Sequence, residues 1–308
     1  MKPPESTTPS SPSSAEQGAP AATDGAAVPP KYWGWQGAAL AFVAAFGALI
    51  FVSIPAVAIG DDTPGATAAG SVVSSILTCV VFVGMPVLIL SMLVGGLRRR
   101  DVGLVLPSRK LWKIPLYAAI AFVVYLLLSN GLRELLDAGD QEDDLPKKLG
   151  AEGSAAAGIV IGIAVTVFAP IGEEFLLRGI VYPGLRDSLS GVTSKWTAIG
   201  IAAVLDGILF GALHIGGSKL VFVPILAVFG MALCLLYQAT GSLYANILVH
   251  ATNNTFAIGI ALDWSFLGGL ALWAFAVTCI TLIALAARAL ELRLPPPRPR
   301  PGAVAAHR

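Results

Sequence analysis

The sequence has few charged residues and no excess of either charge. Only 13% of its 308 residues are charged, about half the share typical of a soluble domain. Lys and Arg total 20 and Asp and Glu total 19, so a net charge of +1 offers no basic surface for nucleic acid. The 56% of hydrophobic residues and the mean hydropathy of +0.76 exclude an ordinary soluble domain and indicate a membrane protein.

Cysteine is scarce as well. The three cysteines, Cys79, Cys234 and Cys279, all lie inside apolar runs. Their spacing forms neither a CxxC pair nor a zinc ribbon, and it gives no disulfide framework. We interpret them as small apolar side chains that face lipid or the protein core.

Apolar runs of about 20 residues, the length that crosses a bilayer, predict eight transmembrane helices. The predicted fold class is therefore an all-α, polytopic membrane bundle of about eight transmembrane helices, formed by residues 33–293. The flanking segments 1–32 and 294–308 are rich in Pro and lack an apolar period, so we predict disordered tails. The eight runs cover residues 36–60, 69–97, 111–130, 154–172, 197–215, 219–239, 243–261 and 265–290.

The charges of the loops predict an orientation. The loop after the second run is basic and is expected to be cytoplasmic, whereas the next loop, over 137–144, is mostly acidic and suits the outer side. Both termini then lie in the cytoplasm, as an even number of spans requires. We expect a multi-pass protein of the cell membrane, and the sequence carries no signal for an oligomeric state. The basic residues of the first of these loops are Arg98, Arg99, Arg100, Arg109, Lys110 and Lys113.

Two adjacent carboxylates, Glu173 and Glu174, interrupt the apolar stretch VTVFAPIGEEFLLRGIVY. A charge at membrane depth costs about 3 kcal/mol on insertion scales, so such residues need partners or a function. On a helix, Glu174 and Arg178 share a face and can pair, whereas Glu173 points about 100° away. We interpret Glu174 and Arg178 as a structural brace and Glu173 as the working carboxylate; a solvated patch at a helix end is the alternative.

Two features leave the depth of these carboxylates open. Pro170 and Gly172 precede them, and because proline breaks a helical hydrogen bond, 171–187 is a candidate for a separate helix that starts at the glutamates. The span boundaries also place His214 toward the outer end of its helix, away from Glu173.

Histidine is the third scarce residue type. Only three occur, and His214 and His250 both lie in apolar runs. Asn254 follows His250 by one helical turn on the same face, and Phe210 precedes His214 by one turn, where it can pack beside the ring. A lone intramembrane histidine is often only a hydrogen-bonding partner between helices. Two of them, with a pair of glutamates, favour a catalytic site.

A carboxylate, two imidazoles and a carboxamide suit the hydrolysis of an amide. Glu173 can act as a general base, with His214 sharing or orienting the attacking water. His250 and Asn254 can donate hydrogen bonds to the oxyanion. No Ser or Cys is paired with a histidine, so a covalent nucleophile is not indicated.

The same side chains also resemble a zinc ligand set, because a glutamate with two histidines leaves a fourth position for water. The sequence has no HExxH, however, and a carboxamide on the His250 face suits an oxyanion better than a metal. We favour a hydrolase without metal or other cofactor and keep zinc as the alternative.

Three motifs resemble those of the CAAX protease and bacteriocin-processing family, also called Abi proteins, which includes the type II CAAX prenyl endopeptidases. Residues 173–178 (EEFLLR) resemble its EExxxR motif, 210–214 (FGALH) its FxxxH motif and 250–254 (HATNN) its HxxxN motif. Each pattern alone is weak, but the three in this order form a strong signal. The resemblance covers about residues 154–261.

The resemblance implies a bundle of about eight helices with an intramembrane active-site cavity. It implies a glutamic protease in which Glu173, assisted by His214, activates water, while His250 and Asn254 lie on the oxyanion side. The implied partners are the lipid bilayer and a membrane-associated protein or peptide substrate, prenylated or not. Alternatives are a metal-dependent version of this protease, a non-catalytic membrane scaffold or immunity protein, and a transporter.

Overall fold

The structure, a computed structural model, describes residues 33–59, 64–106, 113–139 and 141–293. The two predicted tails, 1–32 and 294–308, lie outside the described residues. The described part is helical and contains no strand, apart from an isolated bridge between Ile215 and Ser218.

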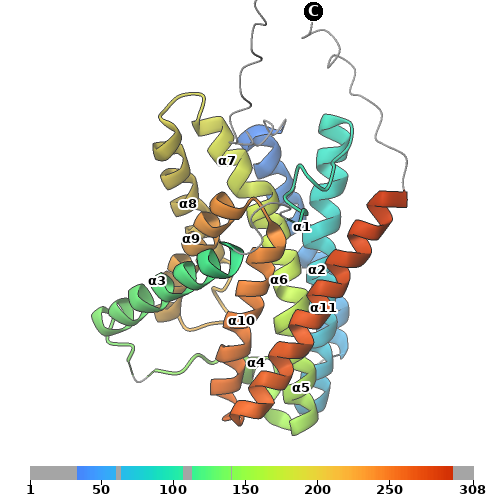
Figure 1. The fold of residues 1–308 in the computed structure, drawn as a ribbon. Helices are drawn as coiled ribbons and strands as arrows, with labels where there is room; N and C mark the ends of the chain where they lie inside the picture. Colours follow the sequence, from blue (N-terminus) through green and yellow to red (C-terminus); the bar gives the residue numbers. More distant parts are fainter. Residues whose placement is uncertain (1–32, 60–63, 107–112, 140, 294–308) are drawn as a thin grey trace, which may run out of the picture.

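Seven helical segments of the described chain are long and apolar enough to cross a membrane. This confirms the predicted class, a polytopic all-α membrane bundle (Figure 1). The segments lie in α1 (Gly34–Ile59), α2 (Pro64–Val94), α3 (Lys113–Leu135), the run from α5 to α7 (Ala155–Leu189), α8 (Lys195–Ala212), α9 (Val223–Thr240) with the short turn before it, and α11 (Phe266–Arg293). The short helix α4 (Leu145–Lys148) lies outside them.

The seventh predicted span is the helix α10 (Leu243–Ala261), which forms where the sequence places it but is not among these seven segments. Its polar side chains lower its hydropathy: Asn246, His250, Asn253 and Asn254 all lie within it. Asn246 and His250 are buried inside the bundle. The predicted span with the lowest hydropathy, α10, therefore contributes much of the polar interior of the bundle.

The fourth predicted span was drawn too short. The chain is helical without interruption from Ala155 to Leu189, a segment of 35 residues, so the separate helix considered over 171–187 is wrong. The glutamates lie near the middle of this segment rather than at an end. Its parts are α5 (Ala155–Ile163), a π-helical segment (Ala164–Phe168), α6 (Ala169–Glu174), a second π-helical segment (Phe175–Val181) and α7 (Tyr182–Leu189).

The first π-helical segment explains how the helix continues through Pro170. In an α-helix, a proline ring meets the carbonyl four residues earlier and removes one hydrogen bond. Here that earlier residue, Thr166, lies within the wider π-helical turn. Such turns occur inside α-helices and are frequent at functional sites.

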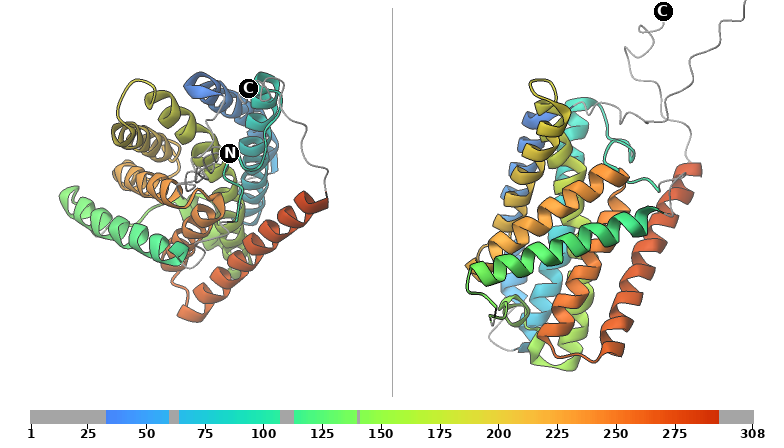
Figure 2. Two further views of the ribbon diagram at one scale, coloured as in Figure 1. Left: turned by 45° about the horizontal axis from the view of Figure 1, so that its top comes forward. Right: turned by 60° about the vertical axis from the view of Figure 1, so that its left-hand side comes forward.

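The long segment from α5 to α7 lies inside the bundle. In an 18-residue apolar stretch of this segment half of the residues are buried, as in such a stretch of Leu220–Thr240, compared with 11–22% in those of α1, α2, α3 and α11. The views of Figure 2 show α3 and α11 at the outside, with α3 crossing α9 obliquely. The glutamates are therefore carried by an inner helix.

Glycines bring α8 and α9 into close contact. A Cβ atom at Gly207 would lie 2.6 Å from a main-chain oxygen of α9, and one at Gly211 would lie 2.5 Å from another. On the facing helix, a Cβ atom at Gly230 would lie 2.9 Å from the Cα atom of Gly207. Small residues four positions apart allow membrane helices to approach in this way.

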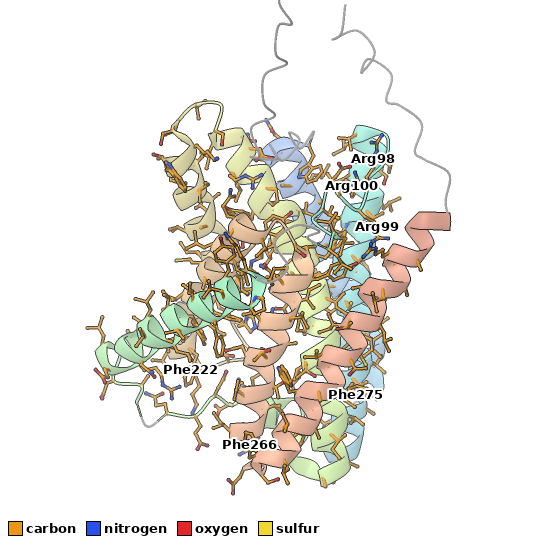
Figure 3. The ribbon with its side chains drawn as sticks, viewed as in Figure 1. Arg98, Arg99, Arg100, Phe222, Phe266 and Phe275 are labelled. Carbon is orange, nitrogen blue, oxygen red and sulfur yellow. The ribbon has the colours of Figure 1, made fainter. Side chains whose placement is uncertain are left out.

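Basic side chains gather at one end of the bundle. Figure 3 shows Arg98, Arg99 and Arg100 beyond the end of α2, at the end of the bundle where α11 also ends. The Arg99 guanidinium donates to the carbonyl oxygen of Ala287 in α11. The positive-inside rule predicts that this end faces the cytoplasm.

Candidate active site

Glu174 and Arg178 form the ion pair that their spacing predicts. The Nη1 atom of Arg178 lies 3.1 Å from Oε1 of Glu174, and both side chains are fully buried. Arg178 also donates through Nη2 to the carbonyl oxygen of Gly230, at 2.7 Å. Its guanidinium lies over the Phe210 ring, 4.8 Å from the centroid, where a cation–π attraction adds to the packing.

A second carboxylate, which the sequence analysis missed, completes this ion pair. The Nε atom of Arg178 lies 3.3 Å from Oδ1 of Asp206, which is also fully buried. The thiol of Cys234 donates to the same oxygen at 3.0 Å. A signal was present: Asp206 precedes Phe210 and His214 at intervals of four residues and is the sole acidic residue in the run 197–215.

Glu174 is also bound to α10, a contact that the spacing of residues within its own helix does not predict. The Nδ1 atom of His250 lies 2.8 Å from Oε1 of Glu174, and Asn246 donates to Oε2 at 3.3 Å. Because an ionised carboxylate can only accept hydrogen bonds, Nδ1 of His250 carries the hydrogen. The ring is therefore held in one tautomer and orientation.

Glu173 lies on the other side of the same ring. Its Oε2 atom is 3.8 Å from Nε2 of His250, which is longer than a hydrogen bond. This oxygen is buried and has no hydrogen-bond partner among the described residues. The Glu173 side chain is 16% exposed whereas that of Glu174 is 0% exposed, so Glu173 is the carboxylate that can meet water or substrate.

His214 lies just beyond the last residue of α8 and is half-buried. Its Nδ1 atom lies 2.9 Å from the carbonyl oxygen of Phe210. Since a carbonyl oxygen only accepts, Nδ1 carries the hydrogen and Nε2 of the neutral ring is available as an acceptor. No hydrogen bond or ion pair joins His214 to Glu173 among the residues that the structure describes.

Phe210 connects the two histidines. Its ring centroid is 5.0 Å from that of His214 and 5.4 Å from that of His250. A further ring, Phe229 of α9, lies 6.0 Å from Phe210 and 5.4 Å from His250, both edge to face. Nothing in the sequence distinguishes Phe229 from other apolar residues of its helix.

Asn254 is held against the long inner helix. Its amide donates through Nδ2 to the carbonyl oxygen of Val165 at 2.8 Å, within the first π-helical segment. Of the four predicted catalytic side chains, the structure thus brings Glu173 and His250 together directly. His214 joins them through Phe210, and Asn254 lies one turn further along α10.

Metal ligation depends on how many of these groups are available. Among the described residues, no group of three or more His, Cys, Asp or Glu side chains is arranged to hold a metal ion. Glu173, Glu174 and His250 are neighbours, but Glu174 is already bound to Arg178 and Asn246. The zinc alternative stays a prediction with its own test.

Part of the chain matches a known family. Residues 155–256, about a third of the 308 residues, match the model of the family described as type II CAAX prenyl endopeptidase Rce1-like. No curated protein and no solved structure matches the chain. The matched segment contains all three motifs and all four predicted catalytic residues. This match supports the resemblance to the CAAX-protease-like family that the motifs predicted.

Proposed function

We propose that the protein is an intramembrane endopeptidase that hydrolyses a peptide bond in a membrane-associated protein or peptide. One observation carries the proposal: His250 lies between two glutamates, bound through Nδ1 to Glu174 and facing Glu173 through Nε2. Glu174 is fully buried, whereas Glu173 is partly exposed and has an oxygen free to accept a proton. The family match supports protease activity at the level of the family.

In the first step, Glu173 acts as the general base. Its carboxylate takes a proton from a water molecule as the water oxygen attacks the carbonyl carbon of the scissile peptide bond. The accepting Nε2 atom of His214 orients that water by taking a hydrogen bond from it. The product is a tetrahedral intermediate whose former carbonyl oxygen carries the negative charge.

In the second step, the oxyanion is stabilised by hydrogen-bond donors of α10. Because Nδ1 of His250 donates to Glu174, the ring can donate to the oxyanion from Nε2 only in its doubly protonated form, with a proton taken from the solvent before the water attacks; Nε2 points to the side of the site where Glu173 lies. The amide of Asn254 uses one hydrogen on Val165 and has a second to donate. As the C–N bond breaks, Glu173 returns the proton to the leaving nitrogen, which gives a free carboxyl group and an amine.

The buried ion pairs position these groups rather than react. Arg178 is bound to Glu174 and Asp206, and Glu174 is bound to His250. A buried charge that is fully paired fixes the geometry of its partners, whereas a buried charge that has lost a partner is costly. Through Arg178 and Glu174, the network therefore links the position of α8 to the orientation of the His250 ring in α10.

The experiment that tests the proposal compares the peptides that accumulate in membranes of cells that carry the wild-type protein or Glu173→Gln. An uncleaved substrate should accumulate with the variant. Glu134→Gln, the same chemical change at an exposed position of α3, is the matched control and should behave as wild type. Identical peptide sets in all three would contradict an endopeptidase. The accumulated peptide also shows whether the substrate is prenylated.

A further inference from the structure

A groove of about 600 Å³ lies between α10 and α11, apart from the candidate active site. Its walls are formed by Phe256 and Ile260 of α10 and by Phe266, Leu270 and Trp273 of α11. None of the four predicted catalytic residues lines it. Its volume falls in the range of about 300–1,000 Å³ that small-molecule sites occupy.

The groove opens toward the surroundings of the bundle, and its walls are apolar there. Phe266 is 80% exposed, Ile260 is 79% exposed and Phe256 is 57% exposed. Figure 3 labels Phe266 at one end of α11, the helix that lies at the outside of the bundle. In a multi-pass membrane protein, hydrocarbon is the solvent of such a surface.

The groove has open space on both walls. A Cβ atom added at Gly259 of α10 or at Gly269 of α11 would meet no heavy atom within 4 Å. Elsewhere α10 and α11 are joined: Trp273 donates through Nε1 to Oγ1 of Thr252 at 3.0 Å. This bond joins the two helices beside the groove, and neither glycine carries a side chain that would narrow it.

One end of the groove is polar. Asp263, the sole charged residue of the lining, lies in the turn between α10 and α11, beside Trp264 and Ser265. Among the residues that the structure describes, its exposed carboxylate forms no hydrogen bond or ion pair. A carboxylate attracts an ammonium group and repels an anionic one. Tryptophan side chains are typical of the membrane interface and also attract ammonium groups.

We propose that this groove binds one phospholipid of the bilayer with an ethanolamine headgroup. Its acyl chain lies along the channel between Gly259 and Gly269, and its ammonium group binds Asp263. The hydrocarbon chain fills the apolar walls, and the single charge at the polar end selects the headgroup. This lipid site is independent of the proposed protease activity, because it uses none of the catalytic residues.

The test is native mass spectrometry of the purified full chain in mild detergent, titrated with phosphatidylethanolamine or phosphatidylglycerol. We expect one ethanolamine lipid to bind, and phosphatidylglycerol to bind about tenfold more weakly, a difference of about 1.4 kcal/mol. Gly259→Leu should reduce binding at least about tenfold, because its side chain fills the channel. Gly200→Leu, at an exposed position of α8 where a Cβ atom also meets nothing, should bind as wild type.

Two further variants keep the test decisive. Gly269→Leu fills the channel from the opposite helix, so the test does not depend on a single variant. Thermal melting shows whether each variant is folded. Asp263→Asn should abolish the preference for ethanolamine over glycerol headgroups and leave the acyl chain bound. Unchanged binding in both leucine variants would overturn the site. Equal binding of the two lipids to the wild-type protein would overturn the assignment of the headgroup.

Discussion

The imidazole of His250 donates a 2.8 Å hydrogen bond through Nδ1 to Oε1 of Glu174, a fully buried carboxylate. The neighbouring carboxylate, Glu173, lies on the Nε2 side of the same ring at 3.8 Å. The two adjacent glutamates thus act on one histidine from opposite nitrogens. Glu174 sets the orientation of the ring, and Glu173 lies on the side where, in the proposed mechanism, water and substrate react.

Glu173→Gln should abolish peptide cleavage without unfolding the protein. Glutamine keeps the shape of the side chain but cannot take the proton from water, and loss of a general base typically reduces the rate by about 10²–10⁴-fold. The side chain is partly exposed and its Oε2 atom has no hydrogen-bond partner among the described residues, so little packing is lost. Cleavage of a substrate identified in cells and thermal melting are the measurements. Normal cleavage by the purified variant would refute the proposed mechanism.

Glu174→Gln, in contrast to Glu173→Gln, should mainly lower the stability of the fold. It removes the charge that faces Arg178 and His250 inside the bundle, and breaking a buried ion pair costs about 3–5 kcal/mol. A lowered melting temperature relative to Glu173→Gln checks this. Equal melting temperatures for the two variants would show that the two glutamates do not divide their roles as the contacts indicate.

Asp206→Asn should destabilise the protein because it leaves Arg178 with one carboxylate instead of two. Cys234→Ala is a matched change on the same oxygen: it removes only a thiol donor, so its cost should be smaller, about 1 kcal/mol. The coupling between Asp206→Asn and Glu174→Gln should be about 0.5–3 kcal/mol, because both pair with one guanidinium. Reversible denaturation of the single and double variants measures it, and strictly additive effects would contradict a shared network.

Cleavage by the wild-type protein should survive exhaustive chelation. In the proposed mechanism, a carboxylate activates the water, and no step requires a metal ion. The measurement is cleavage of the identified substrate before and after treatment with a strong chelator. Activity that is lost and then restored by added Zn²⁺ would instead favour the metal-dependent alternative, with Glu173 and the histidines as ligands.

The positions of the helices could be predicted from the sequence because the bilayer demands apolar runs of fixed length. The run 243–261 became α10 (Leu243–Ala261), and the run 265–290 became most of α11. The fourth run was misjudged because Pro170 and the two glutamates look like an end. Whether the helix ends there depends on its packing against other helices, which the sequence of the run does not show. Gly172 lies so close to α2 that a Cβ atom would be 2.9 Å from the Cα atom of Cys79.

The local contacts of the site were also predictable, but the distant ones were not. A spacing of four residues indicates the pair of Glu174 and Arg178, because a helix places such residues on one face. The bond from Glu174 to His250 spans 76 positions and depends on how α6 packs against α10. Asp206 lay between these cases: its spacing from Phe210 was visible, whereas its partner Arg178 is on another helix.

Gly230→Ala should destabilise the site through packing alone. A Cβ atom there would lie 2.8 Å from Cβ of Phe210 and 3.1 Å from Nη2 of Arg178, so the ring and the guanidinium must both shift. Overpacking of this kind typically costs about 1–3 kcal/mol. Gly200→Ala is the matched control, since a Cβ atom there meets nothing and alanine favours a helix by about 1 kcal/mol over glycine. The melting temperature should therefore fall for Gly230→Ala and stay equal or rise for Gly200→Ala.

Because Phe210 packs against both histidines, cleavage should also fall for Gly230→Ala alone. Unchanged melting and cleavage in Gly230→Ala would show that α8 and α9 separate at little cost, which the close approach of Gly207 and Gly230 argues against.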